Sequence, residues 1–301
     1  MILTKAEFPQ GCVVNAAYRY GASAWTVTGR VETTLADGTP KLFFVKYADG
    51  DTGRSMLQGE YHSMVELYRW APGFVPQPYT WGQLNVTDPD TYFFVCEFIE
   101  MTTDDPDPVQ LATKLAKLHL GSHSPTGKFG FPVPTCRGNV VQAVVPWQSS
   151  WVDFFIQIFQ GIMDMNTKLN GEWKDLEPCV QRTIKYVVPQ VLGPLEADGR
   201  KVVPYLIHGD IWDGNVGTSL ETGEVYVFDA SVYYAHYELE IALWRGLVCK
   251  QLGARVYQTE YLAKMGVSEP AEQFEDRQRL YSAYMTLHAS ACHKGSSFRE
   301  E

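Results

Sequence analysis

The chain has 301 residues, of which 45% are hydrophobic and 20% are charged, and its net charge is −10. These proportions are typical of a globular protein with a substantial core, and the length suggests one large domain or two ordinary ones. The acidic balance argues against a general binder of nucleic acid or of an anionic membrane, because either would need a basic face.

The cysteine pattern restricts the class of protein further. Six cysteines are spread along the chain, and no two of them form a Cys-x-x-Cys pair. Their density is far below that of a disulfide scaffold, so we expect reduced thiols in a cytoplasmic protein. The N-terminal residues lack the apolar core of a signal peptide, and no apolar run reaches transmembrane length.

A β-hairpin is predicted over residues 25–35 and 41–47. Both segments are rich in β-branched and aromatic residues, and Asp37-Gly38 between them is a turn signal. Lys46 lies near the end of the second strand. It is either a charge at a strand end or a lysine that contacts nucleotide phosphates, and the second role needs a carboxylate from a neighbouring helix.

Residues 55–70 supply a candidate for that carboxylate. Apolar residues recur there at helical spacing, and Glu60 lies near the apolar face between Leu57 and Met64. Burying a carboxylate without a partner is costly. Glu60 is therefore either solvated or paired, and Lys46 is its natural partner.

A second hairpin is predicted over residues 79–83 and 91–98, with a turn around residues 88–90. Its last strand runs into Glu97, and an acidic stretch that contains prolines follows at residues 104–108. We expect the chain to leave one lobe for another here, and the segment from Glu97 to supply backbone groups to a nucleotide base.

The second half of the chain is predicted to be mainly helical. Its apolar periodicity indicates helices at residues 109–120, 150–165, 177–192, 236–252, 254–264 and 270–292, and residues 124–150 are expected to be irregular. Glu238 and Glu240 fall in the first turn of the fourth of these helices, where negative charge is favourable.

One short window carries the chemistry. Residues 208–215 read HGDIWDGN, and a predicted strand at residues 225–228 ends at Asp229. Phosphoryl transfer from a metal-bound nucleotide needs one carboxylate that orients the attacking hydroxyl, here Asp210. It also needs oxygen ligands for Mg²⁺, which Asn215 and Asp229 can supply.

Several segments of the chain resemble the fructosamine/ketosamine-3-kinase family, which belongs with the aminoglycoside phosphotransferases and has the protein-kinase-like fold. That family reads close to H-G-D-L-W-x-G-N, followed by D-P-A-x-Y-Y-G-H-x-E. The matching segments here are FVK at 44–46, LAKLH at 115–119, KFGF at 128–131, WVDFF at 151–155, HGDIWDGN at 208–215, FDASVYYAHYE at 228–238 and RQRLY at 277–281.

The resemblance implies a complete site for ATP and Mg²⁺. It implies that Asp210 is the catalytic base and that Asn215 and Asp229 are the metal ligands. Lys46 and Glu60 would be the pair that anchors the phosphates.

The same resemblance implies roles around the acceptor. His208 would brace the catalytic loop. Trp212 would wall the sugar side of the pocket or pack in the core, and His236 and Glu238 would lie on the substrate side.

The sequence departs from the family text at Ala230-Ser231, Ala235 and Glu240, and residues 21–25 do not form a glycine-rich loop. These positions cluster around the substrate side and the nucleotide lid. Two alternatives therefore stay open beside a ketoamine kinase: a small-molecule phosphotransferase of the aminoglycoside or choline kinase type, and a pseudokinase that acts as a scaffold.

We therefore expect an α+β, bilobal, protein-kinase-like fold. Residues 1–100 would form a nucleotide-binding lobe, a small antiparallel sheet with one helix. Residues 101–301 would form a larger and mainly helical lobe that binds the acceptor. The expected reaction is transfer of the γ-phosphoryl group of ATP to a sugar hydroxyl of a fructosamine or ribulosamine, carried by a protein or a small amine, with no nucleic acid or membrane as partner.

Overall fold

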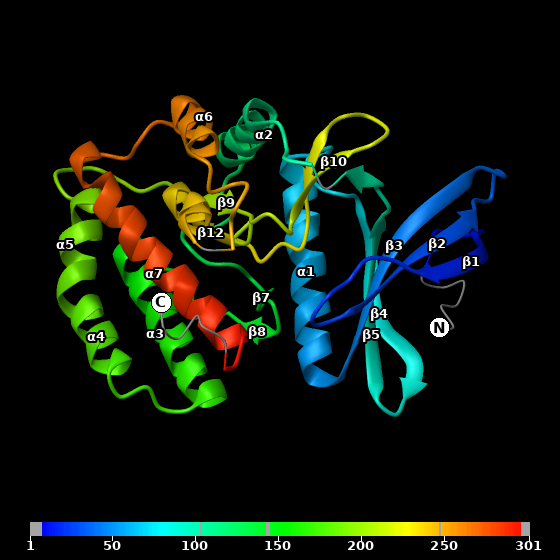
Figure 1. Cartoon of the computed structure of the whole chain (residues 1–301), viewed down its shortest axis with the longest axis horizontal. Helices are drawn as coiled ribbons and strands as arrows, with labels where there is room; N and C mark the ends of the chain where they lie inside the picture. Colours follow the sequence, from blue (N-terminus) through cyan, green and yellow to red (C-terminus); the bar gives the residue numbers. More distant parts are fainter. Residues whose placement is uncertain (1–7, 103, 143–144, 247, 296–301) are drawn as a thin grey trace.

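The computed structural model describes residues 8–102, 104–142, 145–246 and 248–295 (Figure 1). Its N-terminal part is a five-stranded antiparallel sheet with the strand order β1-β2-β3-β5-β4. The strands are β1 (Val13–Arg19), β2 (Val27–Thr34), β3 (Pro40–Asp49), β4 (Pro78–Thr87) and β5 (Asp90–Glu97). Both predicted hairpins are confirmed.

The two faces of this sheet are buried against different partners. Along β5, Phe94 and Cys96 belong to the main core of the protein, and the alternate residues Phe93 and Val95 belong to a second, smaller cluster with Phe8. Alternation of this kind follows from the two-residue period of a strand. A strand that is buried on both faces reads as the continuous apolar run seen at residues 92–96.

Helix α1 (Gly50–Trp70) packs on the main-core face of the sheet and contacts β3, β4 and β5. It begins five residues before the predicted start, directly after β3. Gly53 makes this early start possible, because a Cβ at that position would lie only 2.6 Å from the carbonyl carbon of Ala48. The short link between β3 and α1 fixes the helix beside Lys46, which lies near the end of β3.

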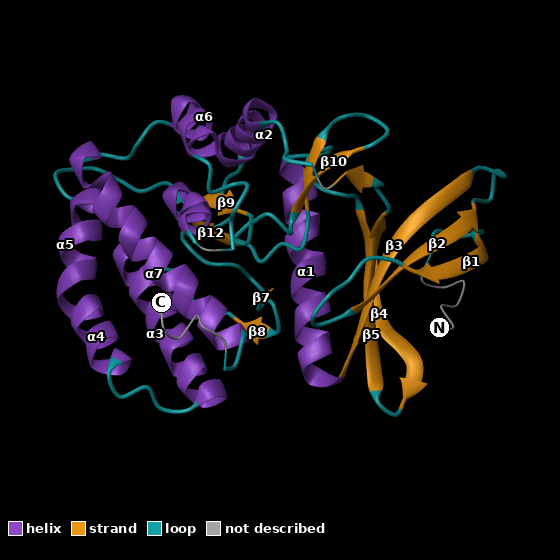
Figure 2. Ribbon diagram, viewed as in Figure 1, coloured by secondary structure: helices purple, strands orange, loops and turns teal. Residues whose placement is uncertain are grey.

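The remainder of the chain is mainly helical (Figure 2). Its α-helices are α2 (Pro108–Gly121), α3 (Trp151–Asn170), α4 (Leu176–Arg182), α5 (Val188–Leu192), α6 (Arg255–Met265) and α7 (Phe274–Cys292). A π-helical turn (Thr183–Val187) joins α4 to α5, and 3-10 turns occupy Gly193–Glu196 and Ala271–Gln273. Helix α3 is a core helix as predicted, since Trp151, Phe154 and Phe155 have no exposed surface.

Three small sheets frame the loops of the helical part. The pairs are β9 (Tyr205–Ile207) with β12 (Tyr233–Ala235) and β7 (Cys136–Arg137) with β8 (Val140–Val141), and the third sheet combines β6 (Met101–Thr102), β10 (Val216–Ser219) and β11 (Val225–Val227). Several of these strands are too short to carry a periodic pattern. Strand β9 begins directly after Pro204, since proline has no N–H for a ladder.

The predicted helix at 236–252 is wrong in type and in length. The structure has a 3-10 helix over Tyr237–Arg245, in which Glu238 and Glu240 are buried together with their apolar neighbours. The two carboxylates do lie in the first turn of this helix, as predicted. Glu238 is paired with Arg277, and Glu240 accepts a hydrogen bond from the backbone of His208.

No helix among the described residues is both long enough and apolar enough to cross a bilayer. The division of the chain into lobes at residue 100 stays a proposal. Strand β5 ends at Glu97, and β6, the next strand, pairs with β10 of the helical part.

Candidate active site

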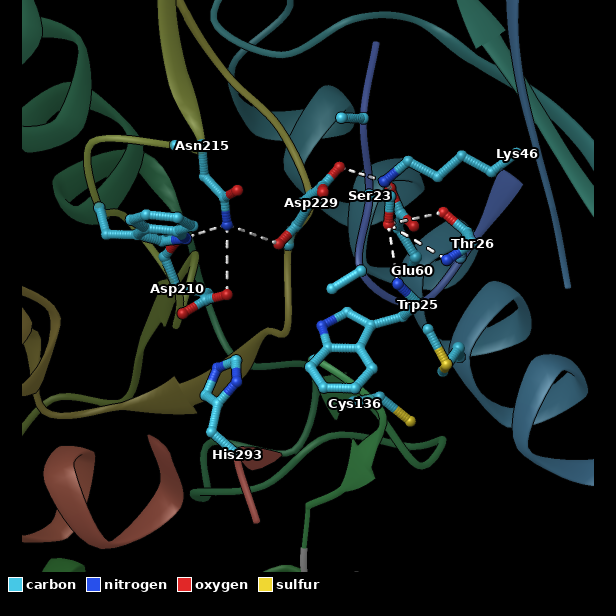
Figure 3. A pocket seen from close by; sticks show the side chains of 17 residues that line it. Ser23, Trp25, Thr26, Lys46, Glu60, Cys136, Asp210, Asn215, Asp229 and His293 are labelled. Carbon is cyan, nitrogen blue, oxygen red and sulfur yellow. Dashed lines mark hydrogen bonds and ion pairs between the residues drawn. The ribbon is translucent and has the colours of Figure 1, made fainter. Parts of the chain in front are cut away.

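A cavity of about 410 Å³ lies between the N-terminal sheet with α1 and the loops of the helical part (Figure 3). We call it the cleft. Among the residues that line it are five that the sequence predicts for nucleotide chemistry: Lys46, Glu60, Asp210, Asn215 and Asp229. They come from β3, α1, the loop after β9 and the segment after β11, so the fold brings together positions more than 180 residues apart.

Lys46 is nearly enclosed, with 7% of its side chain exposed, and its Nζ lies 2.8 Å from Oε1 of Glu60. Nζ also forms an ion pair with Asp229. Burial acts to lower the pKa of Lys46, but the carboxylates of Asp229 and Glu60 outweigh burial and raise it. Lys46 is therefore a permanent cation. The predicted pairing of Glu60 with Lys46 is confirmed.

Glu60 projects from α1 toward the cleft. The preceding residue, Gly59, packs closely on the backbone of Pro134 and Thr135, since a Cβ there would lie 2.7 Å from the carbonyl oxygen of Pro134. Burial raises the pKa of Glu60, and the charge of Lys46 opposes that rise. A buried carboxylate in this position holds the lysine from the side of the helix and leaves the lysine directed into the cleft.

The loop that carries Asp210 is anchored from beneath by Glu240. The carboxylate of Glu240 accepts hydrogen bonds from the backbone N–H groups of His208, at 2.5 Å, and of Gly209, at 3.0 Å. Gly209 has φ +82°, and a Cβ there would lie 2.3 Å from the carbonyl oxygen of Ser231. Only glycine fits this turn, which aims the next residue into the cleft.

His208 is fully buried behind the same loop. Burial lowers the pKa of His208 to about 4, so the ring is neutral near pH 7. The backbone N–H of Asp210 lies 3.3 Å from its Nδ1. This placement fits the predicted bracing role, which stays a prediction.

Asp210 is the carboxylate best placed to act as a base in the cleft. Nδ2 of Asn215 donates to its carbonyl oxygen at 2.9 Å and to its Oδ2 at 3.2 Å. Burial raises the pKa of Asp210 to about 6, and the cation of Arg137 opposes that rise. The carboxylate is thus ionised near neutral pH, yet more basic than an ordinary aspartate.

Arg137 is the site residue that sequence reasoning missed. Its Nε lies 3.3 Å from Oδ1 of Asp210, and its Nη2 donates to the carbonyl oxygen of Gly209. It comes from β7, within the stretch predicted as irregular. No motif or periodicity marks it, so the sequence alone offers no signal for this role.

Asn215 and Asp229 have the chemistry and the placement of metal ligands. The amide nitrogen of Asn215 is directed at Asp210 and also lies 3.5 Å from the carbonyl oxygen of Asp229 (Figure 3). Two hard oxygen donors on one wall of a cleft, with room for phosphate oxygens, suit Mg²⁺. The described residues contain no cluster of three or more His, Cys, Asp or Glu placed around a metal position.

The segment at residues 22–26 forms the rim of the cleft on the side of the sheet. Oγ of Ser23 accepts the backbone N–H groups of Trp25 at 3.2 Å and of Thr26 at 3.1 Å. The turn is thus organised by a serine side chain where the family resemblance would suggest glycines. The ring of Trp25 reaches across to His293 after α7, with 5.5 Å between centroids.

Trp212 lines the cleft and is half-buried. A Cβ on Gly214 would lie 2.5 Å from its ring, so the tryptophan folds back over its own loop. Trp212 therefore both lines the cleft and packs against the core, and its contact with the sugar stays a prediction.

The structure does not bring the other two candidate substrate residues to the cleft. His236 is buried with Nδ1 2.9 Å from the hydroxyl of Tyr281 and Nε2 2.8 Å from that of Ser268. Glu238 is fully buried and accepts two bonds from Arg277, at 2.7 and 3.0 Å. The expectation of substrate contact is wrong for both residues, because their polar atoms form hydrogen bonds with α7 and with the segment before it.

Glu97 also lies away from the residues that line the cleft. It ends β5, where its backbone N–H donates to Gln77 at 2.8 Å and its side chain accepts the backbone N–H of the same residue at 3.3 Å. The side chain is therefore engaged with the start of β4. A contact from Glu97 to a nucleotide base stays a prediction.

Comparisons with known proteins agree with this geometry. The fructosamine kinase family model matches residues 17–300. A chloroplastic protein-ribulosamine 3-kinase of Oryza sativa subsp. indica is 30% identical over 247 residues, which is 81% of this chain and 66% of that protein. The ketosamine-3-kinase of Mus musculus is 31% identical over 225 residues, 66% of this chain and 68% of the relative. The chain thus spans about two thirds of the length of these curated relatives.

A solved structure assigned to the fructosamine-3-kinases, from Haemophilus somnus 129PT, superimposes with a TM-score of 0.72 at 18% identity. The match covers 96% of this chain and 89% of that one. The predicted α+β, kinase-like fold is thereby confirmed.

Proposed function

The chain belongs to the fructosamine kinase family, and we propose that it is a kinase that transfers the γ-phosphoryl group of ATP to a sugar hydroxyl of a ketoamine. One observation carries the proposal. Asp210, a carboxylate whose pKa burial raises to about 6, faces the same cavity as the Lys46–Glu60 pair and Asp229. A base and a phosphate-binding cation thus share one cleft.

Asp210 acts on the acceptor. Its carboxylate accepts a hydrogen bond from the sugar hydroxyl and aligns the hydroxyl oxygen for in-line attack. The hydroxyl proton passes to Asp210 as the acceptor oxygen bonds to the γ-phosphorus and the bond from that phosphorus to the bridging oxygen breaks, so that ADP leaves. Asn215 and Arg137 hold the carboxylate, so that little reorganisation is needed during the transfer.

Lys46 acts on the nucleotide. Its ammonium group, now paired with Glu60 and Asp229, supplies the positive charge that the phosphates need. Asn215 and Asp229 would hold Mg²⁺, which neutralises phosphate charge when bound. Because phosphoryl transfer depends mainly on positioning and electrostatics, these fixed groups account for most of the expected rate enhancement.

Phosphorylation of a ketoamine on its sugar would mark a glycated amine for release, so the cellular role we propose is deglycation-type repair. All six cysteines are free thiols, of which three are buried, two are half-buried and one is exposed. Free thiols are typical of a reducing compartment, which supports a cytoplasmic location.

Purified protein incubated with ATP, Mg²⁺ and a panel of ketoamines, aminoglycosides and amino alcohols would test the proposal by ADP release. We expect turnover of ketoamines that Asp210→Ala abolishes and ATP–Mg²⁺ binding that Asp229→Ala weakens. Turnover of the other acceptors alone would favour a different small-molecule kinase. A protein that does not bind ATP–Mg²⁺ would favour the scaffold alternative.

A further inference from the structure

A smaller pocket of about 140 Å³ lies next to the cleft beside Asp210. We call it the side pocket. It shares five lining residues with the cleft: Trp25, Gly138, Asp210, Trp212 and His293. The two cavities are therefore neighbours, and Asp210 lines both of them.

The inner wall of the side pocket is apolar. It is formed by Leu243, Val248, Met285 and Ala289, and the indole rings of Trp25 and Trp212 stand at its mouth. These residues come from the 3-10 helix, the segment after it, α7 and the rim of the cleft. An apolar pocket next to a catalytic carboxylate favours a ligand with a polar end and an apolar end.

The charges in this wall are already paired. Of the residues that line the side pocket, Arg137 and Asp210 carry the formal charges, and they form one ion pair. Nη1 of Arg137 lies 2.8 Å from the sulfur of Met285, and its Nη2 donates to Gly209. The guanidinium is thus occupied by protein groups, and the described residues that line the pocket offer no unpaired lysine, arginine, aspartate or glutamate to a charged substituent.

The direction of the acceptor follows from these positions. The phosphates belong on the Lys46 side of Asp210, so the reacting hydroxyl lies at Asp210 and the remainder of the acceptor extends away from Lys46. The side pocket begins there. In a ketoamine, the substituent on the amine is separated by only a few bonds from the sugar hydroxyls, so it reaches the pocket when a hydroxyl lies at Asp210.

We propose that the side pocket is a subsite for an apolar substituent on the amine of the acceptor. This rests on the proposed function and narrows it to ketoamines of small aliphatic or aromatic amines. Ketoamines of free amino acids fit less well, because their carboxylate would be desolvated without a partner.

The test is a series of fructosamines made from methylamine, isobutylamine, benzylamine and glycine, together with a fructosyl-lysine peptide. We expect kcat/KM to rise by at least about tenfold from the methyl to the benzyl compound, and the glycine compound to be poorest. Equal values across the series, or a preference for the peptide, would overturn the inference and leave the proposed function standing. No turnover of any ketoamine would instead reject the proposed function.

Filling the side pocket with a larger side chain tests whether the preference for the benzyl compound arises there. Ala289→Phe on α7 would occupy the side pocket, and we expect it to remove the preference for benzyl while the methyl compound is still phosphorylated. Ala283→Phe is the matched control, since this alanine is exposed on the same helix and does not line the side pocket. If Ala289→Phe leaves the preference unchanged, the subsite lies elsewhere.

Val248→Asp provides a second variant in case Ala289→Phe does not fold, as judged by thermal unfolding. The parent protein should prefer the benzyl compound to a fructosamine made from a diamine, because the diamine carries a second positive charge. A carboxylate at the partly buried position 248 should reverse this preference. An unchanged order would also overturn the inference.

Discussion

Nε of Arg137 lies 3.3 Å from Oδ1 of Asp210, and Nη2 of the same guanidinium is bonded to the carbonyl oxygen of Gly209, one residue earlier. One side chain therefore sets both the charge environment of the proposed base and the conformation of its loop. The pair joins positions 137 and 210, which no sequence motif connects.

Replacing Arg137 is expected to change the pH dependence of catalysis. Burial raises the pKa of Asp210 to about 6 and Arg137 opposes the rise, so Arg137→Met should raise this pKa further. Since the base must be ionised, the acidic limb of kcat/KM should move to higher pH in Arg137→Met. Arg137→Lys keeps the charge and should move it less. If the acidic limb of both variants lies at the same pH as that of the parent protein, the cation of Arg137 does not act on Asp210.

Lys46→Met should reduce kcat/KM for ATP by at least about 10²-fold, because it removes the cation directed at the phosphates. The change also leaves Glu60 buried without its partner, so the melting temperature should fall. ATP titration by calorimetry and thermal unfolding measure the two effects separately. Lys117→Met is the control and should affect neither, since Lys117 is exposed on α2 and does not line the cleft.

Glu240→Gln should destabilise the protein by about 1–3 kcal/mol, because two backbone N–H groups of the catalytic loop lose a charged acceptor. Burial acts to raise the pKa of Glu240, but the nearby His119 and His208 outweigh it and the pKa is lowered. A lowered folded-state pKa contributes stability above the unfolded value of about 4.3, and this contribution is lost as pH falls through the folded value.

Urea unfolding of Glu240→Gln and the parent protein between pH 7 and pH 3 would measure this. The difference between them should be largest at pH 7 and shrink on acidification. Glu275→Gln removes an exposed partner of Arg245 and should cost less than about 1 kcal/mol. A similar loss in the two variants would argue against the anchoring role of Glu240.

Arg277→Met tests the corrected role of Glu238. Both side chains of this pair are 0% exposed, so removing the cation should cost about 3–5 kcal/mol in unfolding free energy. Where the variant is folded, KM for the acceptor should stay the same, since Glu238 does not reach the cleft. Arg279→Met, which breaks an exposed pair with Asp276, should be close to neutral. A raised acceptor KM in Arg277→Met alone would restore Glu238 to the substrate side.

The sequence by itself determined the sheet, most of the helices and the five residues that meet in the cleft. Strands and helices leave a period of two or of about 3.6 in the apolar pattern, which a short window reveals. Phosphoryl transfer likewise restricts the residue types, so Asp210, Asn215 and Asp229 stand out by their spacing. Glu60 was found because a carboxylate beside an apolar face needs a partner.

Only the tertiary structure decided how the remaining polar residues are used. Arg137 meets Asp210, Glu238 meets Arg277 and Glu240 meets the loop at His208 through contacts that span at least 30 residues. A local pattern records whether a position is polar, but burial and the identity of its partner depend on segments folded against it. For this reason the pattern placed Glu238 and Glu240 in the first turn of a helix, but it did not show that Glu238 pairs with Arg277 and that Glu240 holds the catalytic loop.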